Sequence, residues 1–561
     1  MRIPVRWPFT LFLALLTVVL SVAGYYFFPH GRAPGPIEWL QSTIDLFKMS
    51  WKWDGTHAAP WPLELARYTG AAFTLSALTK VWMKFFGEQM RRFRLGFWRG
   101  HVVVCGLGRK GLDLARTFRR LRQRVAATDS RPDEDDAEAC QFEGVLLETG
   151  DATRDHTLAM VGVERARYVF AVCRDDHTNI EVAMQTLVRY RECGRRSRLN
   201  CYVHLVNLPL SVLLQRHELL RSRPEGFELR FFNIFENTAR ALFAKHPPED
   251  PAGLQRVHLV VVGLTRLGEA VITQAARVGH YADLRKVRVT MVDAQATARA
   301  ESFLARQPGI AETCEVRVVE MSFLDARFAR LEFVEAAADE RTTVIFCLDA
   351  DDENIALALA VAERGNGPGA LLARVSERKG LAKLLNVARP ELSTRGIHPF
   401  GSVEDVCSWD LLREEKLDVL AKTIADFYRK TYGGPAWEEL PEDLRNSNRA
   451  AADHIDVKLR AVGCERCEVL ASAEPAFAFT GPEVDLLAKM EHERWCADRR
   501  LAGWTPGPRD NERRLHPNLV AWGELSADDQ GKDRAQVVAL PAVLAGAGFG
   551  IRRVAGHTAR G

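Results

Sequence analysis

The sequence predicts a mixed fold: an N-terminal two-helix membrane hairpin, two α/β units built on parallel sheets, and a mainly α-helical C-terminal domain. Twenty residues without a charge lie between Phe9 and Phe28. An apolar strand followed by a glycine turn and a helical segment occurs twice, first from His101 and again from Val257. Beyond Gly434 the pattern changes to helical periodicity alone. Each signal is typical of one part of the predicted fold.

The length and charge of the chain indicate several domains and no nucleic-acid partner. A chain of 561 residues exceeds the size of one core, and its 76 basic and 73 acidic residues nearly cancel. Eleven cysteines, scattered through the chain, favour a reducing compartment. We place a membrane hairpin with a short pore-like helix at residues 1–98. A first α/β unit follows at 99–245 and a second α/β unit at 255–395. A connecting helical segment covers 396–434, and the C-terminal domain covers 435–553.

The first predicted membrane span is the run "FTLFLALLTVVLSVAGYYFF" from Phe9 to Phe28. Its length suffices to cross about 30 Å of hydrocarbon as a helix. A cleaved signal peptide is the alternative, because Arg2 and Arg6 precede the run and "SVAG" resembles a cleavage site. That alternative would place the free thiols outside the cell.

A second, weaker span covers residues 65–86, with Arg67 near one end and Lys80 and Lys84 near the other. An amphipathic helix lying in the membrane interface is the alternative. Basic residues flank both spans on one side, namely Arg2, Arg6, Arg91, Arg92, Arg94 and Arg99. The positive-inside rule therefore places both termini and all large domains in the cytoplasm.

Between the spans, "PIEWLQSTIDLFKMSW" has apolar residues at Ile37, Leu40, Ile44 and Phe47, the spacing of a short amphipathic helix. Helix, short helix, helix is the layout of a two-span cation-channel subunit. No Thr-Val-Gly-Tyr-Gly-like run follows, so potassium selectivity does not follow from the sequence. Asp54 in the next loop is either part of a charged ring or a solvated acid.

The stretch "HVVVCGLGRKG" predicts a strand, a glycine turn and a helix that together bind a nucleotide, as in Rossmann-like folds. Gly106 permits the turn, Gly108 lets the backbone approach a pyrophosphate beside Arg109, and Gly111 lets the helix pack on the strand. The next strand ends at Asp129, whose carboxylate can accept hydrogen bonds from ribose hydroxyls. We expect NAD(H) or an ATP- or ADP-like nucleotide, because this carboxylate disfavours the 2′-phosphate of NADP.

Two further motifs follow, "GDAT" at Gly150 to Thr153 and "DDHTN" after the next apolar strand. With the glycine turn, these residues resemble the cytoplasmic regulatory domains of potassium transporters and channels, the TrkA-N or RCK family, over about residues 100–240. The resemblance implies a regulatory nucleotide and adds the site residues Asp151, Ala152, Thr153, Asp176 and Asn179.

The pattern recurs in "VHLVVVGLTRLG", with Gly263 and Gly268, and in a strand that ends at Asp293. "DADDEN" repeats the aspartate and asparagine, at Asp351 and Asn354, so we infer an internal duplication. Thr265 replaces the middle glycine, and a Cβ there would impede a phosphate. We therefore expect a degenerate second site built on Gly263, Gly268 and Asp293.

The C-terminal helices are similar to the RyR domain of ryanodine receptors. The matches are Asn448, Arg449, Lys458, "EHERW" at Glu491 to Trp495, Trp504 and "LHPNLVAW". Glu491, Arg494, Trp495 and Arg499 share one helix face, which either stacks a base and pairs with phosphate, or anchors a small core with Arg–Glu pairs around it. "CERC" at Cys464 to Cys467 is half of a zinc site or, more simply, a buried turn.

These parts together predict a nucleotide-sensing protein of the bacterial inner membrane, a ligand-gated, potassium-like cation channel or ion-transport regulator. A two-helix hairpin cannot enclose a pore alone, so we expect a homotetramer, with a dimer next. An NAD-dependent oxidoreductase and a non-conducting membrane-tethered signalling or defence sensor are the alternatives. The oxidoreductase lacks a visible catalytic domain, and His156 and His177 are its candidate residues. We assign no catalytic residue and no metal.

The position of the first glycine turn directly after the membrane segment predicts a stiff connection between them. No proline interrupts the chain from Leu63 to Trp98, so one nearly continuous helix is expected there. Arg91, Arg92 and Arg94 would hold this helix at an anionic lipid surface, as a lever or as a simple anchor.

Overall fold

The computed structural model describes residues 7–27, 34–51, 53, 58–194, 197–206, 224–249, 255–334, 337, 339–363, 369–376, 396–402, 418–468 and 477–554. The chain divides into two compact units, Met1–Trp98 and Arg99–Gly561.

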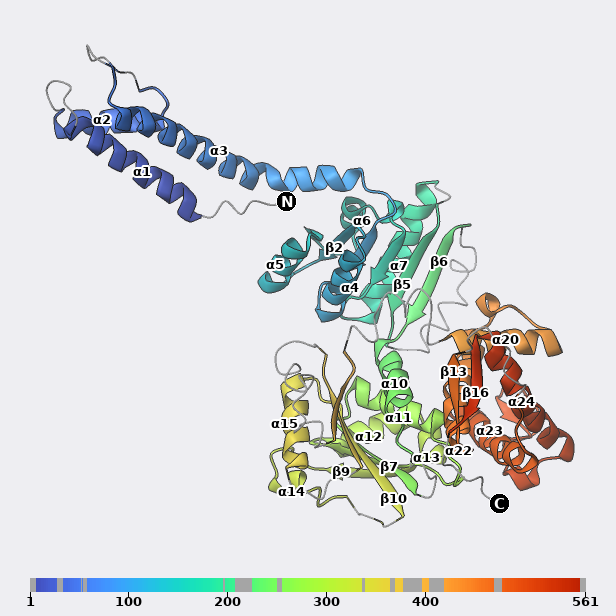
Figure 1. Ribbon diagram of the computed structural model, residues 1–561. Coiled ribbons are helices and arrows are strands. Elements are labelled where there is room, and N and C mark those ends of the chain that lie inside the picture. Colours follow the sequence, from blue (N-terminus) through green and yellow to red (C-terminus); the bar gives the residue numbers. More distant parts are fainter. Residues whose placement is uncertain are drawn as a thin grey trace. The chain divides into compact units, whose positions relative to one another are not determined.

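In its described residues the first unit contains the helices α1 (Trp7–Tyr26), α2 (Pro36–Phe47) and α3 (Trp61–Gly96) (Figure 1). Helix α3 runs unbroken for 36 residues, which confirms the predicted continuous helix as far as Gly96. A hydroxyl pair joins α1 to α3, in which Thr17 Oγ1 lies 2.9 Å from Thr69 Oγ1. Among the residues that the structure describes, no helix is both long and apolar enough to span a bilayer.

Helix α2 forms where it was predicted, but it buries a different face. Ile37, Leu40 and Ile44 are exposed, whereas Thr43 and Leu46 are buried against the neighbouring helices. Ser21 Oγ and Thr43 Oγ1 are 2.7 Å apart, and a Cβ added to Gly70 would lie 2.8 Å from the carbonyl oxygen of Leu46. A hydroxyl pair and a close backbone approach, rather than the apolar stripe, therefore fix α2.

The second unit begins with a six-stranded parallel sheet in the order β3-β2-β1-β4-β5-β6. Its strands are β1 (Val102–Cys105), β2 (Val125–Asp129), β3 (Leu146–Thr149), β4 (Tyr168–Ala171), β5 (Leu199–His204) and β6 (Phe227–Phe232). The connecting elements are α4 (Arg109–Arg120), α5 (Glu134–Glu143), α6 (Asp155–Val161), the short η1 (Val163–Arg165) and α7 (Asp176–Glu192). The order reverses at β1 and β4, as in Rossmann-like folds.

The second sheet repeats this topology, in the order β12-β11-β10-β7-β8-β9, and confirms the duplication. Its strands are β7 (Arg256–Val262), β8 (Arg288–Asp293), β9 (Glu315–Glu320), β10 (Glu340–Phe346), β11 (Ala370–Arg374) and β12 (Ile397–Phe400). Its helices are α11 (Arg266–Val278), α12 (Ala296–Arg306), α13 (Gly309–Thr313), α14 (Ala326–Ala329) and α15 (Asp351–Ala362). Strand β12 lies inside the stretch 396–434 that we expected to be a helical connection.

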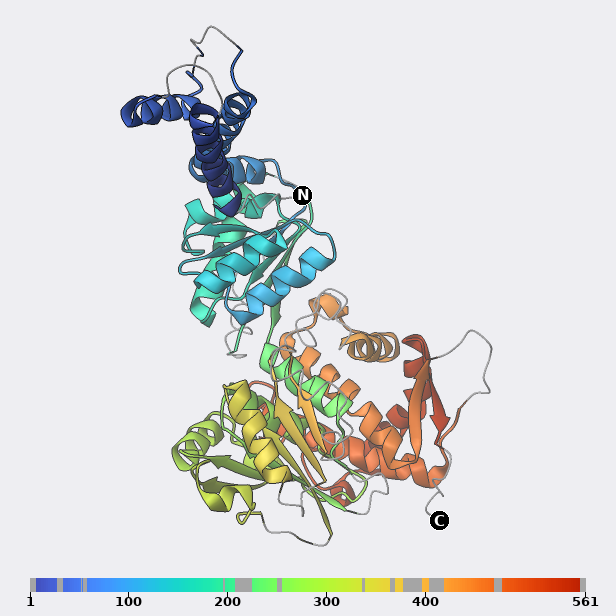
Figure 2. The same ribbon diagram turned by 60° about the vertical axis from the view of Figure 1, so that its left-hand side comes forward.

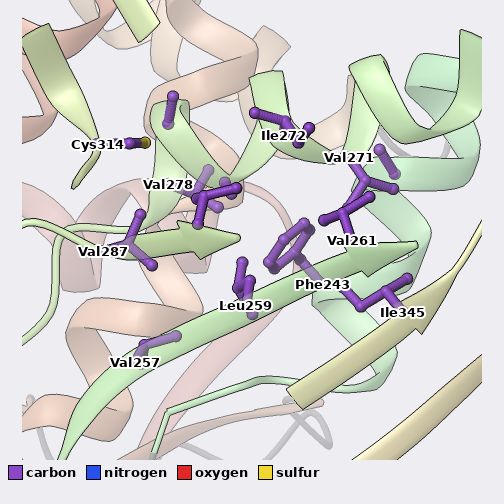
Figure 3. Close-up of a cluster of buried hydrophobic side chains, with 14 of the residues drawn as sticks. Phe243, Val257, Leu259, Val261, Val271, Ile272, Val278, Val287, Cys314 and Ile345 are labelled. Atoms are coloured by element: carbon purple, nitrogen blue, oxygen red, sulfur yellow. The ribbon is translucent and has the colours of Figure 1, made fainter. Parts of the chain in front are cut away.

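The second sheet is covered on both faces. Val261 packs with α11, whereas Val260 and Val262 pack with α15, the yellow helix in Figure 2. Helix α10 (Ile234–Lys245) follows β6 of the first sheet, but its Phe243 packs in this second core beside Leu259 (Figure 3). Its Ile234 packs in the core of the first sheet, so one helix contributes to both cores.

The C-terminal part is mainly helical, as predicted. It contains α20 (Val419–Tyr432), η3 (Trp437–Glu439), α21 (Glu442–Asp453), α22 (Ile455–Ala461), β13 (Cys464–Glu468), α23 (Gly481–Leu501), β14 (Thr505–Pro506), β15 (Leu515–His516), η4 (Trp522–Glu524), α24 (Ala527–Gly546) and β16 (Phe549–Arg553). The "CERC" stretch is not a turn but strand β13, because it pairs antiparallel with β16. Within the described residues, no three metal-ligating side chains come together.

Candidate functional site

The first glycine turn has the geometry of a phosphate cradle. Gly106 has φ +96°, and a Cβ added to it would lie 2.8 Å from the backbone of Cys173. A Cβ at Gly111 would overlap the carbonyl oxygen of Gly106. Gly108 caps the N-terminus of α4, and nothing lies within 4 Å of the place where its Cβ would be. Two glycines thus close the turn, and the third leaves open space beside unpaired amides of the helix.

Asp129 lies beside this open space, at the end of β2. Its Oδ2 accepts a hydrogen bond of 2.7 Å from the amide of Leu107, and its Oδ1 accepts one of 2.9 Å from the amide of Arg131. Each carboxylate oxygen can accept more than one hydrogen bond, so capacity for ribose hydroxyls remains. Arg109 begins α4 in the same turn, and its side chain lies outside the described residues.

The "GDAT" turn is hydrogen-bonded to the end of β2, on the same side of the sheet as the glycine turn. The amide of Gly150 donates to the carbonyl of Asp129 at 2.9 Å, which ties the turn to β2. Asp151 Oδ1 accepts from the amide and the hydroxyl of Thr153, at 3.0 and 2.8 Å, and these bonds lower the pKa of Asp151. Ala152 is buried. Asp151 and Thr153 therefore shape the loop, and their contact with a nucleotide stays a prediction.

The aspartate–asparagine motif is hydrogen-bonded to the ends of neighbouring strands and clamps them together. Asn179 is fully buried, its Oδ1 accepts from the amide of Cys173 at 2.7 Å, and its Nδ2 donates to the carbonyl of His204 at 3.0 Å. Asp176 Oδ1 accepts from the amide of Val206 at 2.9 Å. Asn179 therefore positions the two strand ends, and its contact with a nucleotide stays a prediction.

The second copy repeats this clamp. Asn354 bonds the amide and the carbonyl of Leu348 at 2.9 and 3.0 Å, and Asp351 accepts from the amide of Ser376 at 2.8 Å. Equivalent residues thus make equivalent bonds in both halves. Because the second turn lacks the middle glycine and keeps the clamp, the clamp belongs to the fold.

The second glycine turn keeps its backbone shape but fills the cradle. Gly263 has φ +93°, and a Cβ on Gly268 would overlap the carbonyl oxygen of Gly263. Thr265 Oγ1 donates to the carbonyl of Cys347 at 2.6 Å and accepts from the amide of Gly268. The threonine hydroxyl therefore takes an amide that a phosphate would need.

The aspartate of the second copy is also already paired. Asp293 is buried, and its Oδ2 accepts from the amide of Leu264 and from Arg299 Nη1, each at 2.9 Å. A ribose would have to displace a charge-assisted hydrogen bond. Both features favour a degenerate second site, and whether it binds a ligand stays a prediction.

Lys110 and His204 are a pair near the first turn that the sequence analysis missed. Lys110 is the second residue of α4, and its Nζ lies 3.4 Å from His204 Nε2 and 5.4 Å from the centre of the Phe235 ring. Burial, aided by Lys110, lowers the pKa of His204 to about 3, so the imidazole is neutral and the lysine carries the charge. A lysine one residue after Arg109, at a helix N-terminus, was the available signal.

The predicted RyR face divides into a buried half and a partly exposed half. Lys458 Nζ and Arg494 Nη2 lie 2.6 and 2.7 Å from the two oxygens of Glu491, and all three side chains are buried. Burial opposes the charge on Glu491, but Arg494 and Lys458 hold its pKa below the usual value. Glu491 and Arg494 therefore form a core ion network, the simpler of the two interpretations.

The partly exposed half of that face is a cluster of aromatic rings around Arg499. The Arg499 guanidinium lies 5.7 Å from the centre of the Trp495 ring and 5.5 Å from that of Trp504. The His516 ring contacts Trp495 edge-on, with the ring centres 4.9 Å apart. Trp495 and Arg499 thus remain available for a ligand or a partner, together with Trp504 and His516.

One arrangement in the same domain has the order of a nucleophile, a base and an acid. Cys496 Sγ lies 3.4 Å from His492 Nε2, and His492 Nδ1 lies 3.6 Å from Asp533 Oδ2. Cys496 is only 1% exposed, and His492 Nε2 lies 2.8 Å from the carbonyl oxygen of Val520. A sulfur closed off in this way does not reach a substrate. The exposed residues His156 and His177 lie apart, on α6 and α7.

Comparison with known proteins identifies two parts of the chain. Residues 102–197 match the TrkA-N domain and residues 482–553 match the RyR domain, which confirms both resemblances. An uncharacterised protein of Methanothermus fervidus is 23% identical over 124 residues, which are 21% of this chain and 19% of that protein.

Two similar solved structures are GsuK bound to ADP and the GsuK channel bound to NAD. The first is 17% identical with a TM-score of 0.39, covering 72% of this chain and 96% of that chain. The second is 14% identical with a TM-score of 0.40, covering 74% and 83%. Likenesses this distant do not transfer a ligand or an activity to this chain.

Proposed function

We propose that this chain, which carries a TrkA-N domain at residues 102–197 and a RyR domain at residues 482–553, is a membrane-anchored sensor of an adenine nucleotide that controls ion passage. The observation that carries the proposal is the open cradle at Gly108 with Asp129 beside it. The proposed protein is a regulator and not an enzyme.

The chemistry of the cradle favours NAD(H), ATP or ADP. Amides at the start of α4 would bind phosphate oxygens, and Lys110 supplies a positive charge at the same helix end. Asp129 would accept hydrogen bonds from the ribose of the adenosine. Its charge would repel a 2′-phosphate, so NADP is the disfavoured nucleotide.

The surface of the first unit supports a membrane location. Leu11, Leu15 and Val19 follow one another at helical spacing on α1, and each side chain is more than half exposed. Leu75 and Leu78 on α3 are similarly exposed. Exposing such a stripe to water costs about 25 cal/mol for each Å² of apolar surface, a cost that hydrocarbon removes. Hydroxyl pairs and close glycine contacts between the helices are typical of membrane packing.

Assembly is the next part of the proposal. One hairpin of two helices cannot enclose a conduction path, so several copies must surround an axis in the membrane. We propose a tetramer, with a dimer as the next possibility, in the inner membrane of a bacterium with all large domains in the cytoplasm. Crosslinking in native membranes tests this, and a monomeric species alone would contradict it.

Helix α3 is the proposed connection between the sensor and the membrane. It continues unbroken to Gly96, six residues before β1 begins at Val102. Inserting a flexible Gly-Ser linker after Arg94 separates a lever from an anchor. A lever predicts that nucleotide still binds while its effect on conductance disappears, and an unchanged effect identifies a simple anchor.

Calorimetry on the full chain in detergent tests the nucleotide proposal, with NAD⁺, NADH, ADP, ATP and NADP⁺ as ligands. Gly108→Ala removes the open space and is expected to abolish the heat of binding without changing the unfolding temperature. Gly531→Ala is the matched control, because a Cβ there also meets nothing within 4 Å. No heat with any nucleotide would contradict the proposal. Steady NADH consumption in a substrate screen would instead favour the oxidoreductase alternative.

A further inference from the structure

A cavity of about 720 Å³ lies at the first sheet, away from the glycine turn. Among the described residues, five arginines line it and no acidic residue does. The arginines are Arg99, Arg165, Arg167, Arg198 and Arg230. Tyr168 and Tyr202 supply aromatic surface between them. We call this cavity the arginine pocket.

The strand order explains why the arginines converge. Arg167 directly precedes β4 and Arg198 directly precedes β5, while Arg99 lies three residues before β1. Strands β1, β4 and β5 are parallel neighbours, so the residues before them gather at one edge of the sheet. Gly106 and Asp129 lie at the opposite edge, about 13 Å away along the four residues of β1. The pocket and the cradle are therefore separate sites.

The charges of the pocket are only partly neutralised. Glu228 pairs with Arg198 and with Arg230, and Glu164 pairs with Arg165 at 2.6 Å. Arg189 also pairs with Glu164 and with Asp155, so among the described residues six arginines exceed three carboxylates by three positive charges.

The unpaired charges are identifiable. In the described part of the chain, Arg99 and Arg167 have no carboxylate within ion-pair distance, and both are exposed. Arg167 lies over the ring of Tyr168, 5.4 Å from its centre. The buried Nε of Arg165 has no hydrogen-bond partner among the described residues. The pocket thus holds unused donors as well as unused charge.

Guanidinium groups in this number select a particular anion. Their planar donors match the oxygens of phosphate two at a time, and they bind it with less loss of hydration than lysine does. One phosphate carries a charge of about −2 at most, which does not balance an excess of three. Two or more linked phosphate groups carry enough negative charge to balance it.

We propose that the arginine pocket binds an anion with at least two adjacent phosphate groups, independently of the nucleotide at the glycine turn. The anion is either a soluble polyphosphate or the headgroup of a multiply phosphorylated lipid. Because Arg99 lies three residues after the end of α3, a ligand held there would fix the chain where that helix ends. This inference does not depend on the proposed function.

The test is calorimetry on the full chain in detergent with two probes, inorganic tripolyphosphate and dioctanoyl phosphatidylinositol 4,5-bisphosphate. The perturbing variant carries Arg99→Gln and Arg167→Gln. Its matched control carries Arg330→Gln and Arg513→Gln, which remove two exposed arginines elsewhere. We expect one site per chain in the wild type and a loss of about tenfold in affinity for each pocket arginine removed.

Binding of either probe that falls in the pocket variant and not in the control supports the proposal. The probe that binds more tightly identifies the soluble or the lipid source. Gly108→Ala must leave this binding unchanged, which separates it from the cradle. The unfolding temperature of the pocket variant should match that of the wild type, because neither arginine has a carboxylate partner. No binding of either probe, or equal binding by the pocket variant, would overturn the proposal.

Discussion

Replacing Arg240 by methionine is expected to loosen the attachment of the C-terminal helices to α10. Arg240 is buried, and its Nε and Nη2 lie 2.7 and 2.9 Å from the two oxygens of Asp453 in α21. Its Nη1 lies 2.7 Å from Asp418, directly before α20. Methionine keeps most of the apolar volume but leaves the buried Asp418 and the partly exposed Asp453 without this cation.

The magnitude follows from what remains after the change. Removing one partner of a buried ion pair typically costs about 3–5 kcal/mol. Arg449 still pairs with Asp418 at 2.8 Å, and Gln274 still donates to Asp453 at 3.0 Å. We therefore expect a cost at the lower end of this range, about 3 kcal/mol. This cost corresponds to a local opening that is about 150-fold more frequent.

Amide hydrogen exchange of α20 and α21 in the full chain measures this opening, since global unfolding of several domains is not a two-state process. Arg429→Met is the control, because Arg429 is 45% exposed and pairs with Asp426 of its own helix. Such a surface pair contributes about 0.5 kcal/mol. If both variants exchanged at the same rate, the network around Arg240 would not hold these helices.

The same network predicts a pH dependence. Burial opposes the charge on Asp418, but Arg449 and Arg240 lower its pKa to about 2. The unfolded value is about 3.9, so the folded state is favoured above pH of about 4 and loses this stability as the pH falls toward 2. Hydrogen exchange measured at decreasing pH should show this loss of stability in the wild type. Arg240→Met should show a smaller loss.

Three further changes test the site and the core. Gly111→Ala should prevent folding of the TrkA-N domain, since its Cβ would overlap Gly106, and a normal circular dichroism melting curve would contradict this. Asn179→Ala should lower stability by about 2–4 kcal/mol without altering the preference for NAD⁺ over NADP⁺, and a changed preference would identify Asn179 as a ligand contact. Glu491→Gln should lower stability by about 3 kcal/mol, because it leaves two buried cations without their carboxylate. Arg499→Ala should change the melting temperature little. Equal losses of stability in the two variants would refute the division of that helix face.

The parallel sheets could be predicted because their signals are local. Val102 to Cys105 form an apolar run directly before a glycine turn, and the same order of residues recurs from Val257. Strand β12 and the β13–β16 pair escaped prediction for a physical reason. Ile397–Phe400 has four residues and contains a proline, and β13 pairs with a strand more than 80 residues later in the chain. Neither pairing leaves a local pattern.

The roles of polar residues were harder to predict than their positions. Asn179 was placed correctly after a buried strand, but the sequence does not reveal that its amide is used by Cys173 and His204. Glu491 and Arg494 share a helix face with Trp495 in either interpretation. The contact from Lys458, on another helix, decides that two of them belong to the core. The role of a polar residue depends on its burial and on its partners in other elements. The spacing of residues along the sequence does not predict either.

Current across a planar bilayer containing the purified protein tests the central claim most directly. NADH, ADP and ATP are added to the face that holds the cytoplasmic domains, and the cation current is recorded before and after each addition. We expect the nucleotide that binds in calorimetry to change the current of the wild type and to leave that of Gly108→Ala unchanged. A nucleotide that binds without altering any current would contradict the claim that the sensor controls ion passage.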